Sequence, residues 1–156
     1  MAGLDKVDLA ILRLLQQDGR MSNASLSAQL ALSETPCWRR IKRLQQEGYI
    51  EGYQANLNRR KLGLGVMAFV QITCTRHDAD STREFEAIVL SSPQILSCHN
   101  TTGSADYLLQ VVATDLDGLS EFIEKTLRQL PGVSAIHSNL SLRELKSSGR
   151  LPLQSV

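Results

Sequence analysis

Positive charge is concentrated in one short stretch of the chain, "SETPCWRRIKRL", which runs from Ser33 to Leu44. Four cations lie within five consecutive positions there, and the chain's single tryptophan directly precedes them. No acidic residue occurs from Thr35 to Gln46, so the Glu–Lys pairs that usually lie one turn apart on a solvated helix are missing. Because like charges repel, this composition indicates a surface that phosphate groups neutralise. The cations are Arg39, Arg40, Lys42 and Arg43, and the tryptophan is Trp38.

Helical periodicity separates most of these cations from the apolar residues around them. At about 100° per residue, Cys37, Ile41 and Leu44 point to one side of a helix, and Trp38 lies at the border. The opposite side carries Thr35, Arg39, Lys42 and Arg43. Taken alone, this pattern also fits a solvated helix face without a partner.

DNA binding is the favoured interpretation because this helix is the second of a predicted helix-turn-helix pair. The N-terminal residues of such a helix meet base edges in the major groove. We therefore expect base contacts from the start of the helix and contacts with phosphate or guanine from its cations. The residues expected at base edges are Ser33, Glu34, Thr35 and Trp38, and those expected at phosphate or guanine are Arg39, Arg40, Lys42 and Arg43.

Three helices are predicted in the first fifty residues. Apolar residues recur with helical spacing near the start, and Asp5, Ser22 or Asn23, and Ser33 are of the types that cap helix N-termini. Gly48 ends the third helix, because glycine accepts the left-handed conformation. The last two helices are joined by a tight turn, as in a helix-turn-helix. The predicted spans are 5–17, 22–30 and 33–48.

The second half of the chain contains an internal near-repeat of strand, helix and strand. The apolar runs "VMAFVQITCT" and "DYLLQVVAT" each precede a helical stretch, and Pro93 and Pro131 interrupt the two copies at equivalent places. Two such units in tandem form βαββαβ, a four-stranded antiparallel sheet with both helices on one face. The other face needs a cover, which a second copy of the chain supplies most simply.

The stretch "NRRKLGLG" has the charge and glycine content of a linker between two domains. Before it, residues 50–57 look extended and are expected to form a small strand beside the helices. Up to Lys61 the chain holds ten Lys and Arg against six Asp and Glu, and after it seven against ten, so the halves are expected to have different partners. The predicted domains are 1–57, a linker at 58–65, 66–146 and a tail at 147–156 that either packs back or stays loose.

Cysteine and histidine give no support for a metal site or a disulfide framework. Cys37, Cys74 and Cys98 are odd in number and lack CxxC spacing, so buried reduced thiols are expected. His99 and His137 hold equivalent places in the two half-repeats, but successive strand residues face opposite ways, so Cys98 and His99 do not form a chelate. We expect both histidines on the sheet surface at an oligomer interface, with no metal and no cofactor.

Hydropathy predicts a cytoplasmic protein without a membrane partner. The longest apolar run, around "LGLGVMAFV", is far shorter than the roughly 20 residues that span a bilayer. No apolar signal segment follows the first residue.

Several short motifs, taken together, resemble the Lrp/AsnC (feast/famine) family of transcriptional regulators. They are "LDKVD", "DGR.SN" and "LS.TPC..R...L...G.I.GY" in the first half, and "TGSADYLLQV" and "LPGV" in the second. The similarity extends to about Lys146. One departure is Ala31, where many members have glycine; if this position needs a positive φ, alanine costs about 1 kcal/mol.

The resemblance implies an α+β fold. It consists of an N-terminal winged helix-turn-helix domain and a C-terminal βαββαβ domain of the ferredoxin-like, RAM/ACT-like kind, which dimerises and senses a ligand. In this family the sheets pair into dimers, dimers often join into octamers, and an amino acid binds between dimers. The same partners are expected here: an operator in double-stranded DNA, further copies of the chain and an amino-acid effector.

Chemistry suitable for an amino acid lies in "TTGSADY", at residues 101–107. Asp106 is an anion for the ligand's ammonium, and the backbone N–H groups around Gly103 and Ser104 can bind its carboxylate. Without the resemblance, a plain β-hairpin turn explains the stretch equally well. The family's contact pattern adds three polar residues, which favour a small, polar or sulfur-containing amino acid over leucine. The predicted ligand residues are Asn100, Thr102, Gly103, Ser104, Asp106, Tyr107, Asn139 and Ser141.

The sequence thus predicts a DNA-binding regulator that is not an enzyme and has no catalytic residues. A dimer is expected on a pseudo-palindromic operator with half-sites about 34 Å apart, and effector binding alters assembly or DNA geometry. The alternative is an enzyme on the same architecture, such as a tetrapyrrole (sirohaem) decarboxylase, which has no use for the acid-free basic helix. A ligand-sensing module without DNA is the third and weakest alternative.

Overall fold

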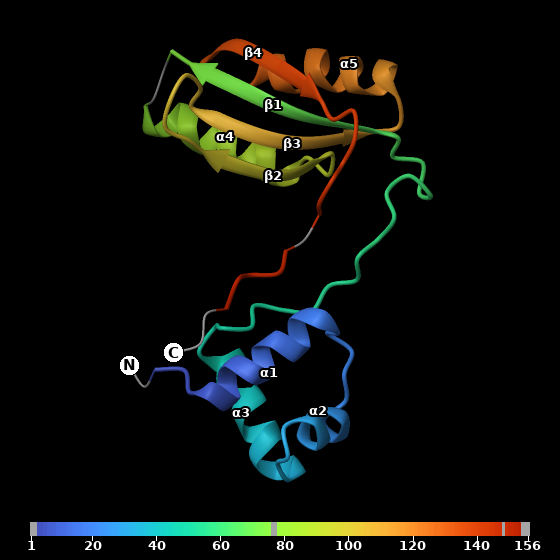
Figure 1. The fold of residues 1–156 in the computed structure, drawn as a ribbon. Coiled ribbons are helices and arrows are strands. Elements are labelled where there is room, and N and C mark those ends of the chain that lie inside the picture. Colours follow the sequence, from blue (N-terminus) through green and yellow to red (C-terminus); the bar gives the residue numbers. More distant parts are fainter. Residues whose placement is uncertain (1–2, 76–77, 148, 154–156) are drawn as a thin grey trace. The chain divides into compact units, whose positions relative to one another are not determined.

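The computed structural model describes residues 3–75, 78–147 and 149–153. The chain divides into two compact units (Figure 1). The N-terminal unit comprises Met1–Asn56 together with the tail, Lys146–Val156, and the sheet unit comprises Leu57–Leu145. The tail therefore belongs to the N-terminal unit, although it follows the sheet unit in sequence.

The N-terminal unit contains the three predicted helices, α1 (Lys6–Gln17), α2 (Asn23–Gln29) and α3 (Glu34–Gln46). Asp5 caps α1 by accepting from the backbone N–H of Asp8, and Ser22 caps α2 in the same way. Ile11, Leu12 and Leu44 form the buried core between α1 and α3. The helix-turn-helix predicted from cap residues and periodicity is confirmed.

The strand expected at residues 50–57 is absent from the described structure, where this segment has no regular secondary structure. A strand is stabilised by hydrogen bonds to a neighbouring strand. The described part of the N-terminal unit contains only helices and irregular segments, so the extended residues have no strand to pair with. The prediction of a strand here is wrong for this physical reason.

Ala31 adopts the left-handed conformation, with φ of 53°. The backbone N–H of Leu32 donates to the carbonyl oxygen of Ser27 at 2.9 Å, and that of Ala31 donates to Ala28 at 3.4 Å. These two bonds form the Schellman motif that ends α2 and makes the tight turn toward α3. Alanine therefore stands where the motif prefers glycine.

We expect Ala31→Gly to raise the stability of the N-terminal unit. Relief of left-handed strain, about 1–2 kcal/mol, outweighs the added freedom of glycine in the unfolded chain, about 0.4–1 kcal/mol. The melting temperature followed by circular dichroism should rise by about 2–8 °C. Ala28→Gly, inside α2 and exposed, is the matched control and should lower it, because glycine in a helix costs about 0.5–1 kcal/mol. An unchanged or lowered melting temperature for Ala31→Gly would contradict the expectation.

The sheet unit has the predicted βαββαβ order, which the structure confirms. All its strand pairs are antiparallel, and the strand order is β2-β3-β1-β4. A short 3₁₀ turn at Leu127–Gln129 precedes the last strand. The elements are β1 (Val66–Cys74), α4 (Ala79–Ser91), β2 (Ile95–Asn100), β3 (Tyr107–Ala113), α5 (Leu116–Lys125) and β4 (Val133–Leu140).

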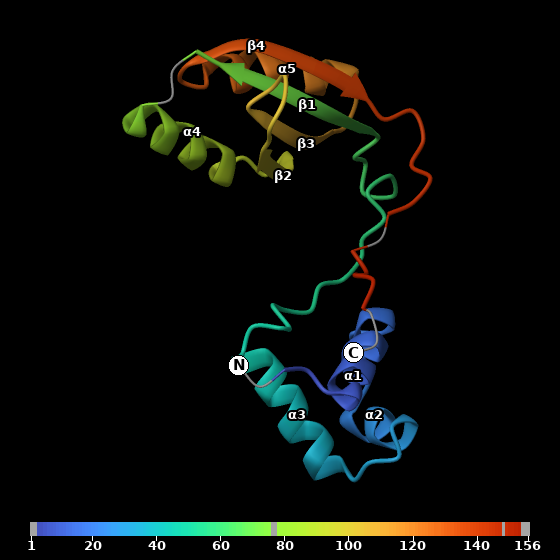
Figure 2. The same ribbon diagram turned by 60° about the vertical axis from the view of Figure 1, so that its left-hand side comes forward.

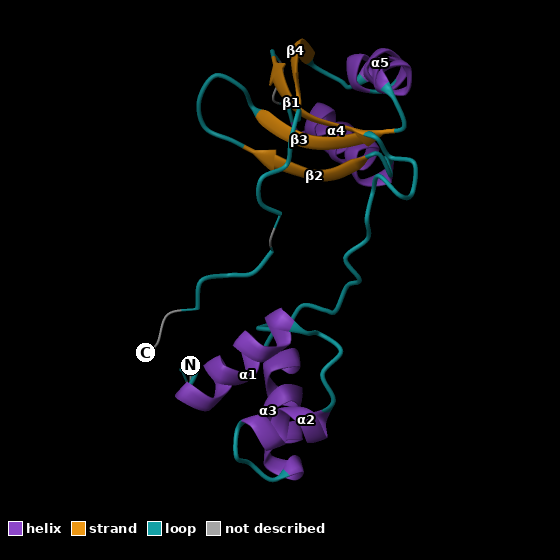
Figure 3. Ribbon diagram, turned by 45° about the vertical axis from the view of Figure 1, so that its right-hand side comes forward, coloured by secondary structure: helices purple, strands orange, loops and turns teal. Residues whose placement is uncertain are grey.

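Both helices cover the same face of this sheet (Figure 3). Alternate residues of the two central strands, among them Val70 and Leu109, are fully buried against Phe85 of α4 and Phe122 of α5. The opposite face, which we call the open face, carries the residues that alternate with these. Phe69 on this face is 40% exposed, which is unusual for a large aromatic side chain in a central strand.

Candidate DNA-binding helix and effector pocket

Helix α3 presents an exposed face with aromatic and cationic side chains. Trp38 is 51% exposed, and the Lys42 ammonium lies 5.9 Å from the centroid of its ring, within the range of a cation–π contact. Arg39 is exposed on the same helix. Cys37 and Leu44 are fully buried on the other side, as the periodicity predicts.

Two of the four cations are held by acids from α1 instead. One guanidinium nitrogen of Arg40 lies 2.8 Å from a carboxylate oxygen of Asp8 and 2.6 Å from one of Asp5. Arg43 pairs with the other oxygen of Asp8, whose side chain is only 1% exposed. The prediction that phosphate neutralises all four cations is therefore wrong for Arg40 and Arg43, because acids of α1 neutralise them.

The same two acids also form the start of α1. The backbone N–H of Asp8 donates to Asp5 at 2.8 Å, and the backbone N–H of Asp5 donates to Asp8 at 3.1 Å, which is a reciprocal capping box. The bond from the N–H of Asp8, followed by the bond from Arg40, lowers the pKa of the Asp5 carboxyl below its usual value. Asp5 and Asp8 thus begin one helix and fasten another. We call Asp5, Asp8, Arg40 and Arg43 the acid–arginine cluster.

This cluster leaves Arg39 and Lys42 as the cations available to a partner. In the part of the chain that the structure describes, neither has an ion-pair partner. Both acids lie in the motif "LDKVD", where only Asp5 was expected to act, as a helix cap; their spacing of three residues is the signal that places them on one face.

The N-terminal end of α3 is exposed to solvent, as it must be if its side chains are to contact base edges. Ser33, Glu34 and Thr35 are exposed, and the side chain of Ser33 makes no capping hydrogen bond. Asn23 of α2 donates a side-chain hydrogen bond to the carbonyl oxygen of Glu34 at 3.0 Å. This bond fixes the helix start relative to α2, so the exposed side chains project from a defined position.

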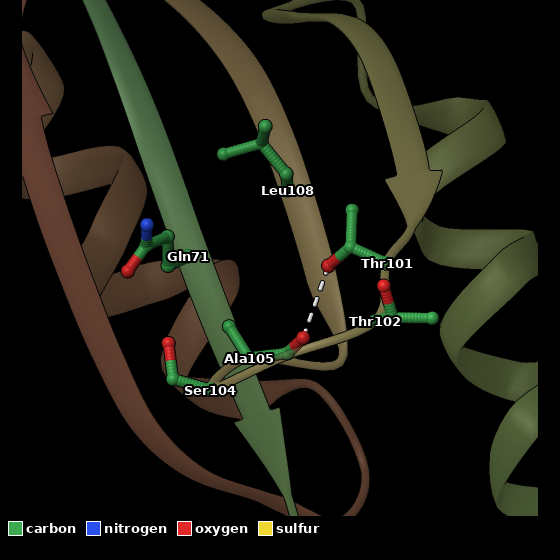
Figure 4. Close-up of a pocket in the computed structure, with 6 residues that line it drawn as sticks. All are labelled: Gln71, Thr101, Thr102, Ser104, Ala105 and Leu108. Carbon is green, nitrogen blue, oxygen red and sulfur yellow. Dashed lines mark hydrogen bonds between the residues drawn. The ribbon is translucent and has the colours of Figure 1, made fainter.

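A pocket of about 220 Å³ lies on the sheet unit, where the loop between β2 and β3 meets the open face (Figure 4). The hydroxyl of Thr101 donates to the carbonyl oxygen of Ala105 at 3.0 Å and shapes the loop. Among the predicted ligand residues, Thr102 and Ser104 line the pocket. The complete lining is Gln71, Thr101, Thr102, Ser104, Ala105 and Leu108.

The other predicted ligand residues do not line this pocket. A carboxylate oxygen of Asp106 accepts from the backbone N–H of Cys74 at 2.7 Å and thereby bridges β3 to β1. The ring of Tyr107 stacks on Phe85 in the core, with centroids 4.3 Å apart. Asn100 donates to the carbonyl oxygen of Asp106 at 3.1 Å. These three residues support the hairpin that carries the pocket.

The remaining three predicted ligand residues lie on the turn between β2 and β3, on β4 and directly after β4. Gly103 has φ of 118°, a positive value that glycine can adopt in a hairpin turn. Asn139 is exposed on β4 opposite Phe69, and Ser141 donates its backbone N–H to Met67 at 2.9 Å.

Two pocket residues, Gln71 and Leu108, belong to a row of four residues, one from each strand, that are paired side by side across the open face. His99 of β2 pairs with Leu108, Leu108 with Gln71, and Gln71 with His137 of β4. Since neighbouring strands lie about 4.8 Å apart, three steps place the two histidines about 14 Å apart. They cannot share a metal ion within one chain. Among the described residues, no group of three or more His, Cys, Asp or Glu side chains is placed to hold a metal ion.

The three cysteines, all within the described residues, carry free thiols. Cys37 is buried, and Cys74 and Cys98 are half-buried. Burial raises the pKa of each thiol above its usual value, which favours the protonated form over the thiolate. The described helices include none long and apolar enough to cross a bilayer.

Comparison with protein-family models assigns both units. Residues 4–51 match the winged helix-turn-helix DNA-binding model, and residues 67–151 match the Lrp/AsnC ligand binding domain. The Bkd operon transcriptional regulator of Pseudomonas aeruginosa is 40% identical and is matched over 98% of this chain and 100% of its own. The leucine-responsive regulatory protein of Salmonella typhimurium is 39% identical over 97% and 93% of the two chains.

Solved structures agree with this assignment. A transcriptional regulator of Neisseria meningitidis in complex with L-Met has a TM-score of 0.92 and 40% sequence identity, covering 96% of this chain and 97% of its own. An AsnC family transcriptional regulator of Agrobacterium tumefaciens has a TM-score of 0.90 at 30% identity, covering 96% and 97%. These relatives are regulators of transcription rather than enzymes. With its helix-turn-helix and its ligand-binding sheet unit, this chain belongs to the Lrp/AsnC family of transcriptional regulators.

Proposed function

We propose that α3 enters the major groove of an operator and that Arg39 and Lys42 contact its phosphates. The observation that carries this proposal is the division of cations on α3. Arg40 and Arg43 are paired with buried and half-exposed acids, whereas Arg39, Lys42 and Trp38 face solvent without an acidic neighbour on the helix. Ser33, Glu34 and Thr35 project from the helix start toward base edges.

The protein acts on DNA as a homodimer in the cytoplasm. Two copies joined through the open face cover Phe69, His99 and His137, which one chain leaves exposed. A two-fold dimer fits a pseudo-palindromic operator with half-sites about 34 Å apart. Assembly into the octamer stays a prediction that rests on the family resemblance.

An amino acid is the effector, and it binds at the pocket between the β2–β3 loop and the open face. Four of the six lining residues are polar and none is charged, which suits hydrogen bonding to a small or polar amino acid. The L-Met in the Neisseria meningitidis structure supports an amino-acid ligand on this fold. A tetrapyrrole polycarboxylate is unsuitable, because the described lining offers it no cation. The Asp106 clamp for the ligand ammonium stays a prediction.

A thermal-shift scan against the twenty amino acids tests this proposal. An amino acid at a hundredfold excess over its Kd stabilises the folded protein by about 2.7 kcal/mol, and the melting temperature rises accordingly. Thr102→Val should weaken binding of that amino acid about tenfold in a calorimeter, because it removes an exposed hydroxyl that has no hydrogen-bond partner among the described residues.

Thr82→Val on α4 is the control for this measurement. Its hydroxyl donates to the carbonyl oxygen of Asp78 at 3.0 Å, and it does not line the pocket. Equal weakening by both variants, or none by Thr102→Val, would place the ligand elsewhere. Binding of leucine but not of serine, cysteine, asparagine or methionine would contradict the expected polarity of the ligand.

A further inference from the structure

The C-terminal tail ends beside the N-terminal unit (Figure 2), and hydrogen bonds join it to two successive turns of α1. The backbone N–H of Leu151 donates to the side-chain oxygen of Gln16 at 2.6 Å, and the Gln16 amide donates back to the carbonyl oxygen of Leu151 at 3.3 Å. One turn earlier, the guanidinium of Arg13 donates to the carbonyl oxygen of Leu153 at 3.0 Å. The side-chain amide of Gln16 thus makes two reciprocal hydrogen bonds with the backbone of Leu151.

The side chain of Leu153 adds an apolar contact to these bonds. It packs against the core formed by Ile11, Leu12 and Leu44. Between the two leucines, Pro152 restricts the backbone, and the N–H of Leu153 closes a tight turn onto the carbonyl oxygen of Leu151 at 3.0 Å. We call Leu151–Leu153 the clasp, because it is short, preshaped and held at both ends.

The clasp gives the N-terminal unit a second connection to the sheet unit. The chain crosses between the two units once at residues 56–57 and again at residues 145–146. The second crossing follows β4, the edge strand that pairs with β1, and β1 carries Gln71 of the pocket. The N-terminal unit is thus joined to the sheet unit by two stretches of chain rather than one.

At its other end, α1 is bound to the DNA-binding helix. Asp5 and Asp8 on its first turn hold Arg40 and Arg43 of α3. The clasp lies on the last turns of the same helix, at Arg13 and Gln16. A continuous set of contacts therefore runs from the tail through α1 to α3.

We propose that the clasp transmits effector binding from the sheet unit to the DNA-binding helix, with the last turns of α1 and the core beside them as its docking surface. This inference rests on the proposed amino-acid-responsive DNA binding. With the clasp docked, a change around β1 and β4 reaches α1 and α3. With the clasp released, the pocket still binds its amino acid and α3 still binds DNA, but the two events are no longer coupled.

The test uses the full chain and two variants that release the clasp from opposite sides. Leu153→Asp removes the apolar contact from the tail, and Gln16→Ala removes the two hydrogen bonds that Gln16 makes with Leu151. Gln17→Ala changes the exposed neighbour on the same helix and is the control. The DNA is a fragment that the wild-type protein selects from a random pool. The Kd of each protein for this fragment is measured with and without each of the twenty amino acids, L-methionine first.

Wild type and Gln17→Ala should show the same ratio of the two Kd values, about 5- to 150-fold for an allosteric pair. Both clasp variants should bring this ratio close to one, while their amino-acid Kd and their DNA Kd without amino acid stay within about threefold of wild type. A ratio that persists in Leu153→Asp and Gln16→Ala overturns the role of the clasp but leaves the proposed function standing. A wild-type ratio of one for all twenty amino acids overturns the proposed amino-acid response, and the role of the clasp with it.

Discussion

Replacing Asp8 with asparagine should destabilise the N-terminal unit by about 3 kcal/mol. Removing one partner of a buried ion pair costs about 3–5 kcal/mol, and the lower value applies because Arg40 and Arg43 are 31% and 39% exposed. A folded domain is stable by only about 0.05–0.15 kcal/mol per residue, so a unit this small loses a large part of its stability. Urea unfolding followed by the fluorescence of Trp38, which lies on α3, measures the change.

The matched control removes the charge of Glu47, an acid that lies outside the acid–arginine cluster but near its Arg43. Glu47 lies 3.9 Å from the guanidinium of Arg43, and its side chain is 43% exposed. An exposed pair contributes only about 0.3–0.5 kcal/mol, so Glu47→Gln should hardly change the unfolding midpoint. If Asp8→Asn unfolds at the same urea concentration as Glu47→Gln, the acid–arginine cluster does not hold α3 to α1.

Arg39→Ala and Lys42→Ala should each reduce the salt dependence of DNA binding. For B-DNA, log K falls with log salt at a slope of about −0.9 for each neutralised phosphate. One substitution removes two phosphate contacts from a dimer, so the slope should become less steep by about 1.8. Fluorescence anisotropy with the selected fragment at several salt concentrations measures both slopes.

Arg40→Ala gives the contrasting result. Because Asp5 and Asp8 already hold this guanidinium, its loss should lower the stability of the N-terminal unit and leave the salt slope unchanged. All variants are compared at a temperature at which circular dichroism shows them folded. A slope that changes by the same amount for Arg40→Ala and Arg39→Ala would show that the acids release Arg40 to DNA.

The elements of the fold were predictable because their signals are local. Asp5 and Ser22 cap helices within three residues of themselves, and Gly48 has the positive φ expected of a helix terminator. The alternation of apolar residues fixes which face of each strand is buried. The one local prediction that failed, the strand at residues 50–57, depended on a neighbouring strand that no local signal reports.

The site was predictable only in part because its contacts are long-range. Arg40 and Asp8 are 32 residues apart, so their pairing depends on how α1 packs against α3. Spacing on one helix identified four cations but could not divide them into two structural and two available ones. In the sheet unit, Thr102 and Ser104 were named from their loop and line the pocket, whereas Gln71, which lies on another strand and also lines it, was not named.

The acid–arginine cluster has a consequence for how the protein finds its operator. Every cation that touches phosphate strengthens binding to all DNA, whatever its sequence. By neutralising Arg40 and Arg43, Asp5 and Asp8 are expected to shorten the time that the protein stays on any random stretch of the chromosome. The base-reading residues then contribute a larger share of the total affinity, and the ratio of specific to non-specific binding rises. Two acids at the start of α1 are thus expected to speed the search for the target while they hold α3 in place.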